Sequence, residues 1–350
     1  MRQTLLILFV IIFYACNTSQ KIVEPKTTNQ ENNSQLPEEV IIAPIVSIPY
    51  VSKDDVKNSM EYLASDELEG RATGTEGIEK AARYIENFMH SNGIQPYFET
   101  YRDNFEFENS RAAKSGEDAP LVKGFNIVGL IEGVDPLLKK EYIILGGHYD
   151  HIGFGKEVNG DSIANGANDD ASGTIAAMEI GKYFAKSKTN KRSILITLFS
   201  AEEMGLRGSR HLAKRLSNVG IDAYTMINFE MIGVPRAADK TVAYMSGYER
   251  SNFAETLNKY AKEDIIGFFD QAKAMNLFMR SDNFPFYNAL KIPAHAISTF
   301  DFSNFDYYHH VDDEADKMNY DHMANFINKM IPALEGMMNA PNKEVILKNE

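Results

Sequence analysis

The stretch SILITLFSAEE at residues 193–203 joins a seven-residue apolar run to two adjacent acids, Glu202 and Glu203. A short apolar run rich in β-branched residues and bounded by polar ones predicts a buried strand. Successive side chains of a strand point to opposite faces, so an extended backbone would send the two carboxylates into different environments. We therefore expect Glu202 and Glu203 to have two separate tasks.

Similar apolar runs recur along the chain and predict further strands at 125–131, 141–147, 224–229 and 292–298. Patterns of helical period predict helices at 52–65, 75–93, 171–186, 208–216, 252–263 and 321–338. The segment 104–123 is polar and irregular, which predicts a surface loop. Strands that alternate with helices indicate an α/β fold with a mixed, mostly parallel central sheet flanked by helices.

The N-terminal residues predict an exported protein. Residues 1–15 combine an early arginine with a short apolar core, as in a signal peptide, and FYAC at 13–16 resembles a bacterial lipobox. We expect lipidation at Cys16, a disordered tether over 16–49 and a position facing the periplasm or cell envelope. The lipid would be the only membrane contact, and plain signal cleavage is the alternative. Residues 50–340 then form a single globular domain, and 341–350 form a C-terminal tail.

Composition narrows the function. The chain has 350 residues, is 44% hydrophobic and 24% charged, and carries a formal net charge of −13. An acidic surface repels phosphate backbones, so nucleic acid is not expected as a partner. A single cysteine excludes an intramolecular disulfide. Oligomeric state and side-chain preference stay open.

Polar residues with metal-binding chemistry follow the predicted strands. They are His148, Asp150, Asp169, Glu202, Glu203, Glu230 and His309. Ligands meet at the carboxyl ends of strands in open α/β sheets, so we expect these groups to converge. Imidazole and carboxylate ligands without cysteine suit zinc or a similar divalent ion, and the number of acids suits two metal ions better than one. Taken singly, each group could instead be a helix cap, a solvated strand end or a loop histidine.

Four segments in order carry a resemblance to a known family. HYDHIG (148–153), GANDDASG (166–173), SAEEMGLRGS (200–209) and YHHVDD (308–313) resemble the di-zinc aminopeptidases of clan MH, in their bacterial secreted branch. The resemblance implies a zinc-exopeptidase fold of the phosphorylase/hydrolase-like type. It also implies hydrolysis of N-terminal residues from peptides with a free N-terminus, with two divalent metal ions, zinc expected, as cofactors.

The resemblance also implies a role for each residue. The first metal is held by His148 and Glu230, the second by Glu203 and His309, and Asp169 bridges both. Asp150 orients His148, and Glu202 is the general base. Glu230 stands where the family pattern has aspartate, and its extra methylene is expected to affect the first metal. His151 is expected to line the site without binding metal, and Ser281 with Asp282 to support it.

Other activities remain open at this stage. Glutaminyl cyclases share the fold, although they line their pocket with tryptophan, which this chain lacks. Carboxypeptidase activity would need a basic cluster, for which Arg207, Arg210 and Arg280 are candidates. A non-catalytic binding protein on the same scaffold is a further alternative. A two-carboxylate glycosidase is disfavoured, because its mechanism would not require the histidines.

Overall fold

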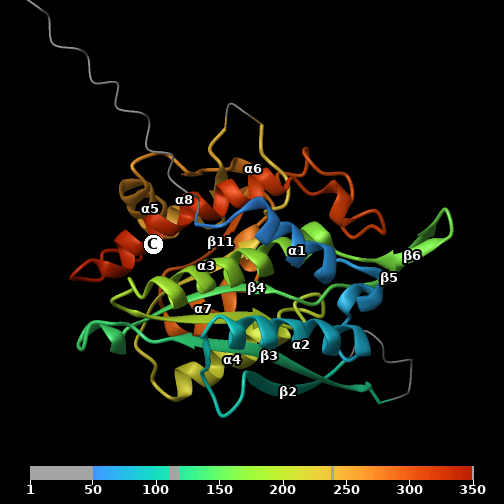
Figure 1. The fold of residues 1–350 in the computed structure, drawn as a ribbon, viewed down its shortest axis with the longest axis horizontal. Helices are drawn as coiled ribbons and strands as arrows, with labels where there is room; N and C mark the ends of the chain where they lie inside the picture. Colours follow the sequence, from blue (N-terminus) through green and yellow to red (C-terminus); the bar gives the residue numbers. More distant parts are fainter. Residues whose placement is uncertain (1–49, 110–117, 238–239, 349–350) are drawn as a thin grey trace, which may run out of the picture. The chain divides into compact units, whose positions relative to one another are not determined.

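The computed structural model describes residues 50–109, 118–237 and 240–348 (Figure 1). The expected signal peptide, Cys16 and the tether therefore lie outside the described residues. Within the described ranges, no helix has both the length and the apolar character needed to cross a bilayer.

A mixed sheet forms the centre of the domain (Figure 1). Its strands are β1 (Gln95–Pro96), β2 (Arg102–Glu108), β3 (Leu121–Ile131), β4 (Tyr142–His148), β7 (Ser193–Phe199), β8 (Ala223–Glu230), β9 (Ala243–Met245), β10 (Ile266–Gly267) and β11 (Ala294–Ser298). The order is β1-β3-β7-β4-β8-β11-β9-β10, with β2 paired to β3. The neighbours β7, β4, β8 and β11 are all parallel, and β1, β2, β3 and β9 add antiparallel pairs. This confirms the predicted α/β class and mixed sheet.

Helices cover both faces of the sheet (Figure 1). One layer contains α1 (Lys53–Leu63), α2 (Glu76–Ser91), α3 (Gly173–Ser187), α5 (Phe253–Ala261) and α8 (Tyr320–Asn339), and the other contains α4 (Arg207–Asn218) and α7 (Asn283–Leu290). Along β7, Ile194 and Ile196 pack into the cluster of the first layer, whereas Leu195 and Phe199 pack into that of the second. Both faces of this strand are buried, which explains its continuous apolar run.

The prediction of a surface loop over 104–123 was wrong for 104–108 and 121–123, which lie in strands, and its part over 110–117 lies outside the described residues. Arg102–Glu108 forms β2 and pairs antiparallel with the first half of β3, from Arg102 opposite Ile127 to Glu108 opposite Leu121. Phenylalanines and glutamates alternate through FEFE at 105–108, which is the period-two pattern of a strand with one covered face. The many charged residues concealed this pattern.

Residues beyond α8 lie against the domain. The backbone N–H of Val345 donates to the hydroxyl of Tyr224 at 2.8 Å, and the Val345 side chain is buried. Leu347 forms a β-bridge with Ser251 next to α5.

A buried arginine ties together the segments behind the strand ends. Arg71 is 1% exposed, and its guanidinium donates to the carbonyl oxygens of Leu63, Tyr149 (2.9 Å), Asn165 (2.6 Å) and Gly166 (2.9 Å). Burial lowers the pKa of Arg71 to about 10, while nearby aspartates oppose this effect, so the group is charged at neutral pH. The end of α1, the end of β4 and the turn before α3 thus share one cation.

We expect Arg71→Met to lower the free energy of unfolding by ~3–5 kcal/mol, because it leaves four carbonyl groups buried without their donor. The measurement is urea unfolding followed by circular dichroism. Arg83→Met is the matched control, since Arg83 is exposed and its one ion pair within the described residues is with the exposed Glu76. Equal unfolding midpoints for the two variants would contradict this role of Arg71.

Candidate metal centre

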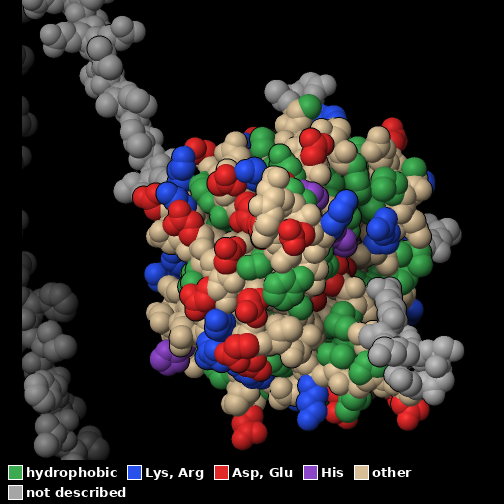
Figure 2. Space-filling model, turned by 90° about the vertical axis from the view of Figure 1, so that its right-hand side faces the viewer, with side chains coloured by type: hydrophobic (Ala, Val, Ile, Leu, Met, Phe, Trp, Pro, Cys, Tyr) green, Lys and Arg blue, Asp and Glu red, His purple; other side chains and the backbone are tan. Residues whose placement is uncertain are grey.

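The predicted site residues converge at the carboxyl ends of the parallel strands. His148 ends β4, Glu230 ends β8, and Glu203 follows β7. Asp169 lies in the segment before α3, and His309 lies in the loop after β11. Figure 2 faces this side of the molecule, where imidazoles emerge among acidic, basic and apolar side chains.

The first group of possible ligands surrounds the His148 ring. Its Nε2 atom lies 3.2 Å from Asp169 Oδ1 and 3.5 Å from Glu230 Oε1. His148 and Asp169 are almost fully buried, and Glu230 is more exposed. Burial alone would lower the pKa of His148, but contacts with Asp150, Asp169 and Glu230 raise it well above its ordinary value.

The second group surrounds the His309 ring. Its Nε2 atom lies 3.2 Å from Asp169 Oδ2 and 3.2 Å from Glu203 Oε2. The two oxygens of Asp169 therefore face different histidines. A carboxylate placed in this way can bridge two cations, which is the role that the resemblance implied for Asp169.

The spacing of these atoms fits zinc. With zinc–ligand bonds of about 2.0–2.1 Å, two ligands of one tetrahedral ion lie about 3.3 Å apart. The contacts of 3.2–3.5 Å around His148 and His309 match this edge length. They also join a ring nitrogen to a carboxylate oxygen in every case, the donor set that zinc prefers when cysteine is absent.

His151 belongs to the same cluster of possible ligands, although the sequence analysis expected it to line the site without binding metal. Its Nδ1 atom lies 3.0 Å from Glu203 Oε1 and 4.0 Å from Asp169 Oδ2. Among the described residues, neither His151 nitrogen nor Glu203 Oε1 has a hydrogen-bond partner, and all three atoms are buried. Buried polar atoms are normally satisfied, so this arrangement is better suited to a shared cation than to the metal-free protein. The position of His151 in the segment HYDH (148–151), three residues after His148, was the signal in the sequence that could have indicated this.

Asp170 approaches His148 and Glu230 as closely as a ligand would, yet its oxygens are already used. They accept backbone N–H groups from His148 (3.2 Å), Gly173 (3.1 Å) and Met231 (2.9 Å). Burial, with Glu230 nearby, raises the pKa of Asp170. We therefore infer that Asp170 holds the surrounding backbone in place and that Asp169 is the candidate metal ligand of the pair.

Glu202 and Glu203 do separate, but not by strand alternation. Residues after β7 leave the strand at Ala201, which has a φ of 55°, and turn. The Glu202 carbonyl accepts from the N–H groups of Gly205 (2.8 Å) and Leu206 (2.9 Å). Glu203 then faces two imidazoles, whereas the Glu202 carboxylate makes no hydrogen bond within the described residues. Burial and neighbouring acids raise the pKa of Glu202 well above its ordinary value.

Asp150 connects His148 to the turn that follows β7. Its carbonyl oxygen is 3.0 Å from His148 Nδ1, closer than its carboxylate at 3.6 Å. The carboxylate accepts the Glu202 backbone N–H at 3.2 Å and the Thr73 hydroxyl at 3.3 Å, and Thr73 accepts the N–H of Ala201 at 2.8 Å. Asp150 therefore orients the His148 ring mainly through its backbone and positions Glu202 through its side chain. Sequence reasoning missed Thr73.

Two further groups support the ligands. Ser281 donates to Glu230 Oε2 at 2.6 Å and Asn228 donates to the same oxygen at 3.0 Å. Asp313 accepts the backbone N–H groups of Asn168 (2.8 Å) and Asp169 (3.1 Å). Ser281 was expected to support the site, and the structure places it there.

A small pocket of about 90 Å³ opens beside the ligands. Its apolar side chains are Met231, Tyr244, Leu277, Phe300, Phe302 and Tyr308. It can accept one apolar side chain next to the carboxylates of Glu202 and Glu230. The aromatic residues near 300–308 thus shape a cavity as well as packing together.

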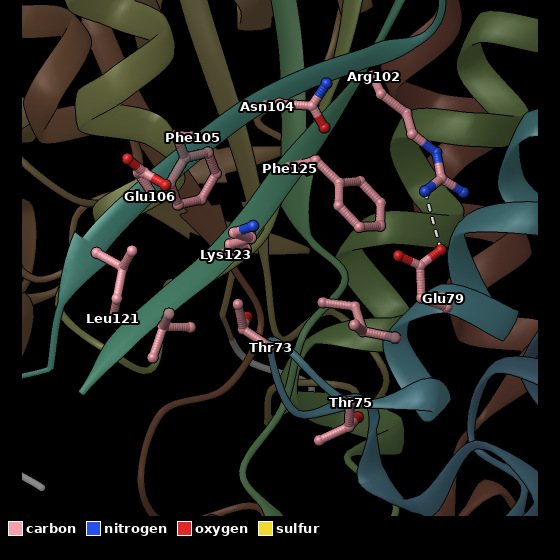
Figure 3. Close-up of a pocket in the computed structure, with 14 residues that line it drawn as sticks. Thr73, Thr75, Glu79, Arg102, Asn104, Phe105, Glu106, Leu121, Lys123 and Phe125 are labelled. Carbon is pink, nitrogen blue, oxygen red and sulfur yellow. Dashed lines mark hydrogen bonds and ion pairs between the residues drawn. The ribbon is translucent and has the colours of Figure 1, made fainter.

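A larger cavity of about 700 Å³ lies between the β2–β3 hairpin and the segment entering α2 (Figure 3). Phe105 and Phe125 line it, and Arg102 pairs with Glu79 across one wall at 2.8 Å. No histidine lines it, so we place the chemistry in the smaller pocket. Thr73 connects its edge to Asp150.

The α/β fold and the two groups of possible ligands around Asp169 define a candidate two-metal centre at the edge of a mixed sheet. A model of Peptidase family M28 matches residues 126–334, more than half of the chain, and the chain therefore belongs to this family.

Curated relatives agree with this assignment. A "Probable zinc metalloprotease" of Pyrenophora tritici-repentis is 34% identical over 138 residues, which cover 38% of this chain and 30% of that protein. A "Probable leucine aminopeptidase" of Trichophyton verrucosum is 22% identical over 331 residues, covering 90% of this chain and 80% of that protein. The chain thus spans less than a third of the length of the first of these relatives.

Solved structures share the fold. The zinc aminopeptidase BSAP of Bacillus subtilis has a TM-score of 0.62 at 15% identity, covering 85% of this chain and 98% of that chain. A glutaminyl cyclase of Fimbriiglobus ruber also has a TM-score of 0.62, at 18% identity, covering 81% and 95%. At such identities the likeness establishes the fold alone, and it does not separate these two activities.

We expect the zinc-loaded protein to retain two zinc ions per chain after dialysis, and Asp169→Asn to retain fewer than one, because the neutral amide would lack the charge needed to bridge two cations. The measurement is metal analysis by mass spectrometry. Asp312→Asn is the control, since this half-exposed carboxylate pairs with His310 and with no predicted metal ligand within the described residues. Retention of both ions by Asp169→Asn would contradict the bridging role.

We also expect the metal-free protein to lose stability as pH rises from about 5 to about 8. Burial raises the pKa of Asp282 and of Asp313 to about 7, and Asp169 with Glu203 raises that of His309 to about 10. Each group binds its proton more tightly in the folded chain, so its stabilisation is present at low pH and is lost as pH rises through the folded pKa.

Zinc reverses this slope, because protons then compete with the metal for ligand atoms such as the His309 ring nitrogen. Urea unfolding across this pH range, with and without zinc, measures both slopes. Slopes of equal sign would contradict the assignment of His309 to a metal centre.

Proposed function

We propose that this protein is a di-zinc aminopeptidase that removes N-terminal residues from peptides. The observation that carries the proposal is the Asp169 carboxylate, whose two oxygens lie 3.2 Å from the two imidazoles of His148 and His309. Membership of a peptidase family and the aminopeptidase name of a relative support the same conclusion.

In this proposal His148 and Glu230 hold the first ion, and Glu203 with His309 holds the second. His151 adds a nitrogen beside Glu203. Bound zinc ions polarise a scissile carbonyl and make a neighbouring water acidic. The chain's own part is to place these ions and to leave one carboxylate free.

Glu202 is the residue that we assign to proton transfer. Burial and neighbouring acids raise its pKa above the ordinary value, which makes it a stronger base, and it lines the pocket with no hydrogen bond or ion pair to a histidine within the described residues. It would accept the proton of the attacking water and return it to the leaving amine. Its backbone N–H is bonded to Asp150, so this position is linked to the His148 ring.

The apolar pocket supports trimming from the N-terminus. It would accept the first side chain of the peptide, while the free α-amine lies among carboxylates, which favour a positive charge. Glutaminyl cyclase activity would release ammonia from an N-terminal glutamine, whereas aminopeptidase activity would release the free amino acid. The products of glutamine-initiated and leucine-initiated peptides therefore separate the two.

We further propose export as a lipoprotein facing the periplasm or cell envelope, anchored only through Cys16. This part rests on the sequence of residues 1–16.

We expect Glu202→Gln to keep two zinc ions and to lose about 10²–10⁴-fold in kcat on leucine p-nitroanilide, since the amide cannot accept the proton. Glu203→Gln should instead bind the second ion more weakly. Metal titration and initial rates on both variants provide the measurement. Activity of Glu202→Gln near that of the wild type would refute its role as base.

The specificity control uses N-acetyl-leucine p-nitroanilide. Acetylation removes the charge of the α-amine, so an aminopeptidase should hydrolyse this compound far more slowly. Equal rates on the free and acetylated substrates would exclude aminopeptidase activity. Hydrolysis of neither substrate by zinc-loaded protein would favour the non-catalytic alternative.

A further inference from the structure

A cleft of about 340 Å³ extends outward from the catalytic residues. It shares Glu202, Glu203, Tyr308 and His309 with the apolar pocket, but it also contains two arginines. Arg280 lines both cavities, and Arg210, from the first turn of α4, lines only the outer one. Positive charge therefore lies where the two cavities meet, at Arg280, and continues into the outer cleft at Arg210.

Neither arginine pairs with an acid in the part of the chain that the structure describes, although carboxylates are abundant nearby. Within the described residues, Arg280 makes no side-chain hydrogen bond or ion pair, and Arg210 makes only a 3.4 Å contact from Nε to the Gly205 carbonyl. By contrast, Arg215 on the same helix pairs with Asp103. Two cations that have no acidic partner among the described residues and lie beside Glu202 can bind an anionic part of a substrate.

We propose that Arg210 and Arg280 form a carboxylate-binding subsite beyond the scissile bond. The inference rests on the proposed aminopeptidase function. If the N-terminal side chain fills the apolar pocket, the rest of the peptide leaves past Glu202 toward the arginines. Each extended residue advances the chain about 3.3–3.6 Å, so a carboxylate one or two residues beyond the bond comes within reach of an arginine side chain.

The chemistry of the cleft favours this ligand. Guanidinium groups bind carboxylates through two parallel hydrogen bonds, and these charge-assisted bonds are stronger than neutral ones. Met279 and Tyr308 line the same cleft with exposed apolar surface, which a bound peptide would cover. Removal of water from this surface strengthens the ion pair.

A carboxylate in this position has two sources. It is the C-terminus of a dipeptide or tripeptide, or the side chain of an acidic second residue. Leu-Gln, Leu-Gln-amide and Leu-Glu-amide distinguish them. We expect kcat/KM to be roughly tenfold or more higher for the carboxylate-bearing substrate than for Leu-Gln-amide. Preference for Leu-Gln identifies short peptides as substrates, and preference for Leu-Glu-amide identifies acidic second residues.

The variants test which side chains cause this preference. Arg280→Gln and Arg210→Gln should each reduce the ratio of kcat/KM between the carboxylate and amide substrates, and Arg280→Lys should restore part of it. Arg207→Gln is the matched control, because it removes the same charge from α4 while Arg207 lies over Phe107 and outside the cleft. It should keep the wild-type ratio.

A binding measurement separates this inference from the proposed function. Calorimetry of the same peptides with zinc-loaded Glu202→Gln reports affinity without turnover. Tighter binding of the carboxylate-bearing peptide, lost when Arg280→Gln is combined with Glu202→Gln, supports the subsite even if the wild type hydrolyses nothing. Equal kcat/KM and equal affinity for all three peptides, or a ratio unchanged in both arginine variants, would overturn it.

Discussion

Negative charge gathered at the carboxyl ends of four parallel strands is the constraint on which the rest of this structure depends. Asp169 is almost fully buried, and Glu202, Glu203 and Glu230 share its pocket. Carboxylates that share one pocket in a low-dielectric environment repel one another strongly. Imidazoles separate them, and the remaining unsatisfied atoms of His151 and Glu203 face each other across the space that a cation would fill.

The surrounding backbone limits the electrostatic cost of gathering these carboxylates. Asp313 accepts the backbone N–H groups of Asn168 and Asp169, and Asp170 accepts those of Gly173 and Met231, so the backbone around the bridging residue is held without the use of its own carboxylate oxygens. Arg71 supplies a permanent positive charge behind them and bonds only to carbonyl groups. The oxygens of the candidate ligands are thereby left free to bind metal, while the buried charges of Asp170, Asp313 and Arg71 are satisfied by backbone groups.

The sequence could predict the elements and the site residues because both follow local rules. Apolar runs such as 193–199 mark buried strands, and residues at their ends converge by the geometry of parallel sheets. It could not predict how the chain turns there. The left-handed conformation of Ala201, rather than strand alternation, separates Glu202 from Glu203. His151 and Thr73 depend on contacts between distant segments, and β2 was concealed by its charges.

Glu230 shows how a departure from the family pattern can be accommodated. A longer side chain would be expected to move its carboxylate relative to the shorter aspartate. Here one oxygen is fixed by Ser281 and Asn228, which also bond to each other at 2.8 Å. The other oxygen then lies 3.5 Å from His148 Nε2, only slightly farther than Asp169 Oδ1 at 3.2 Å. The added methylene is thus matched by two donors, one from β8 and one from the turn before α7, and the first group keeps the spacing of a zinc ligand set.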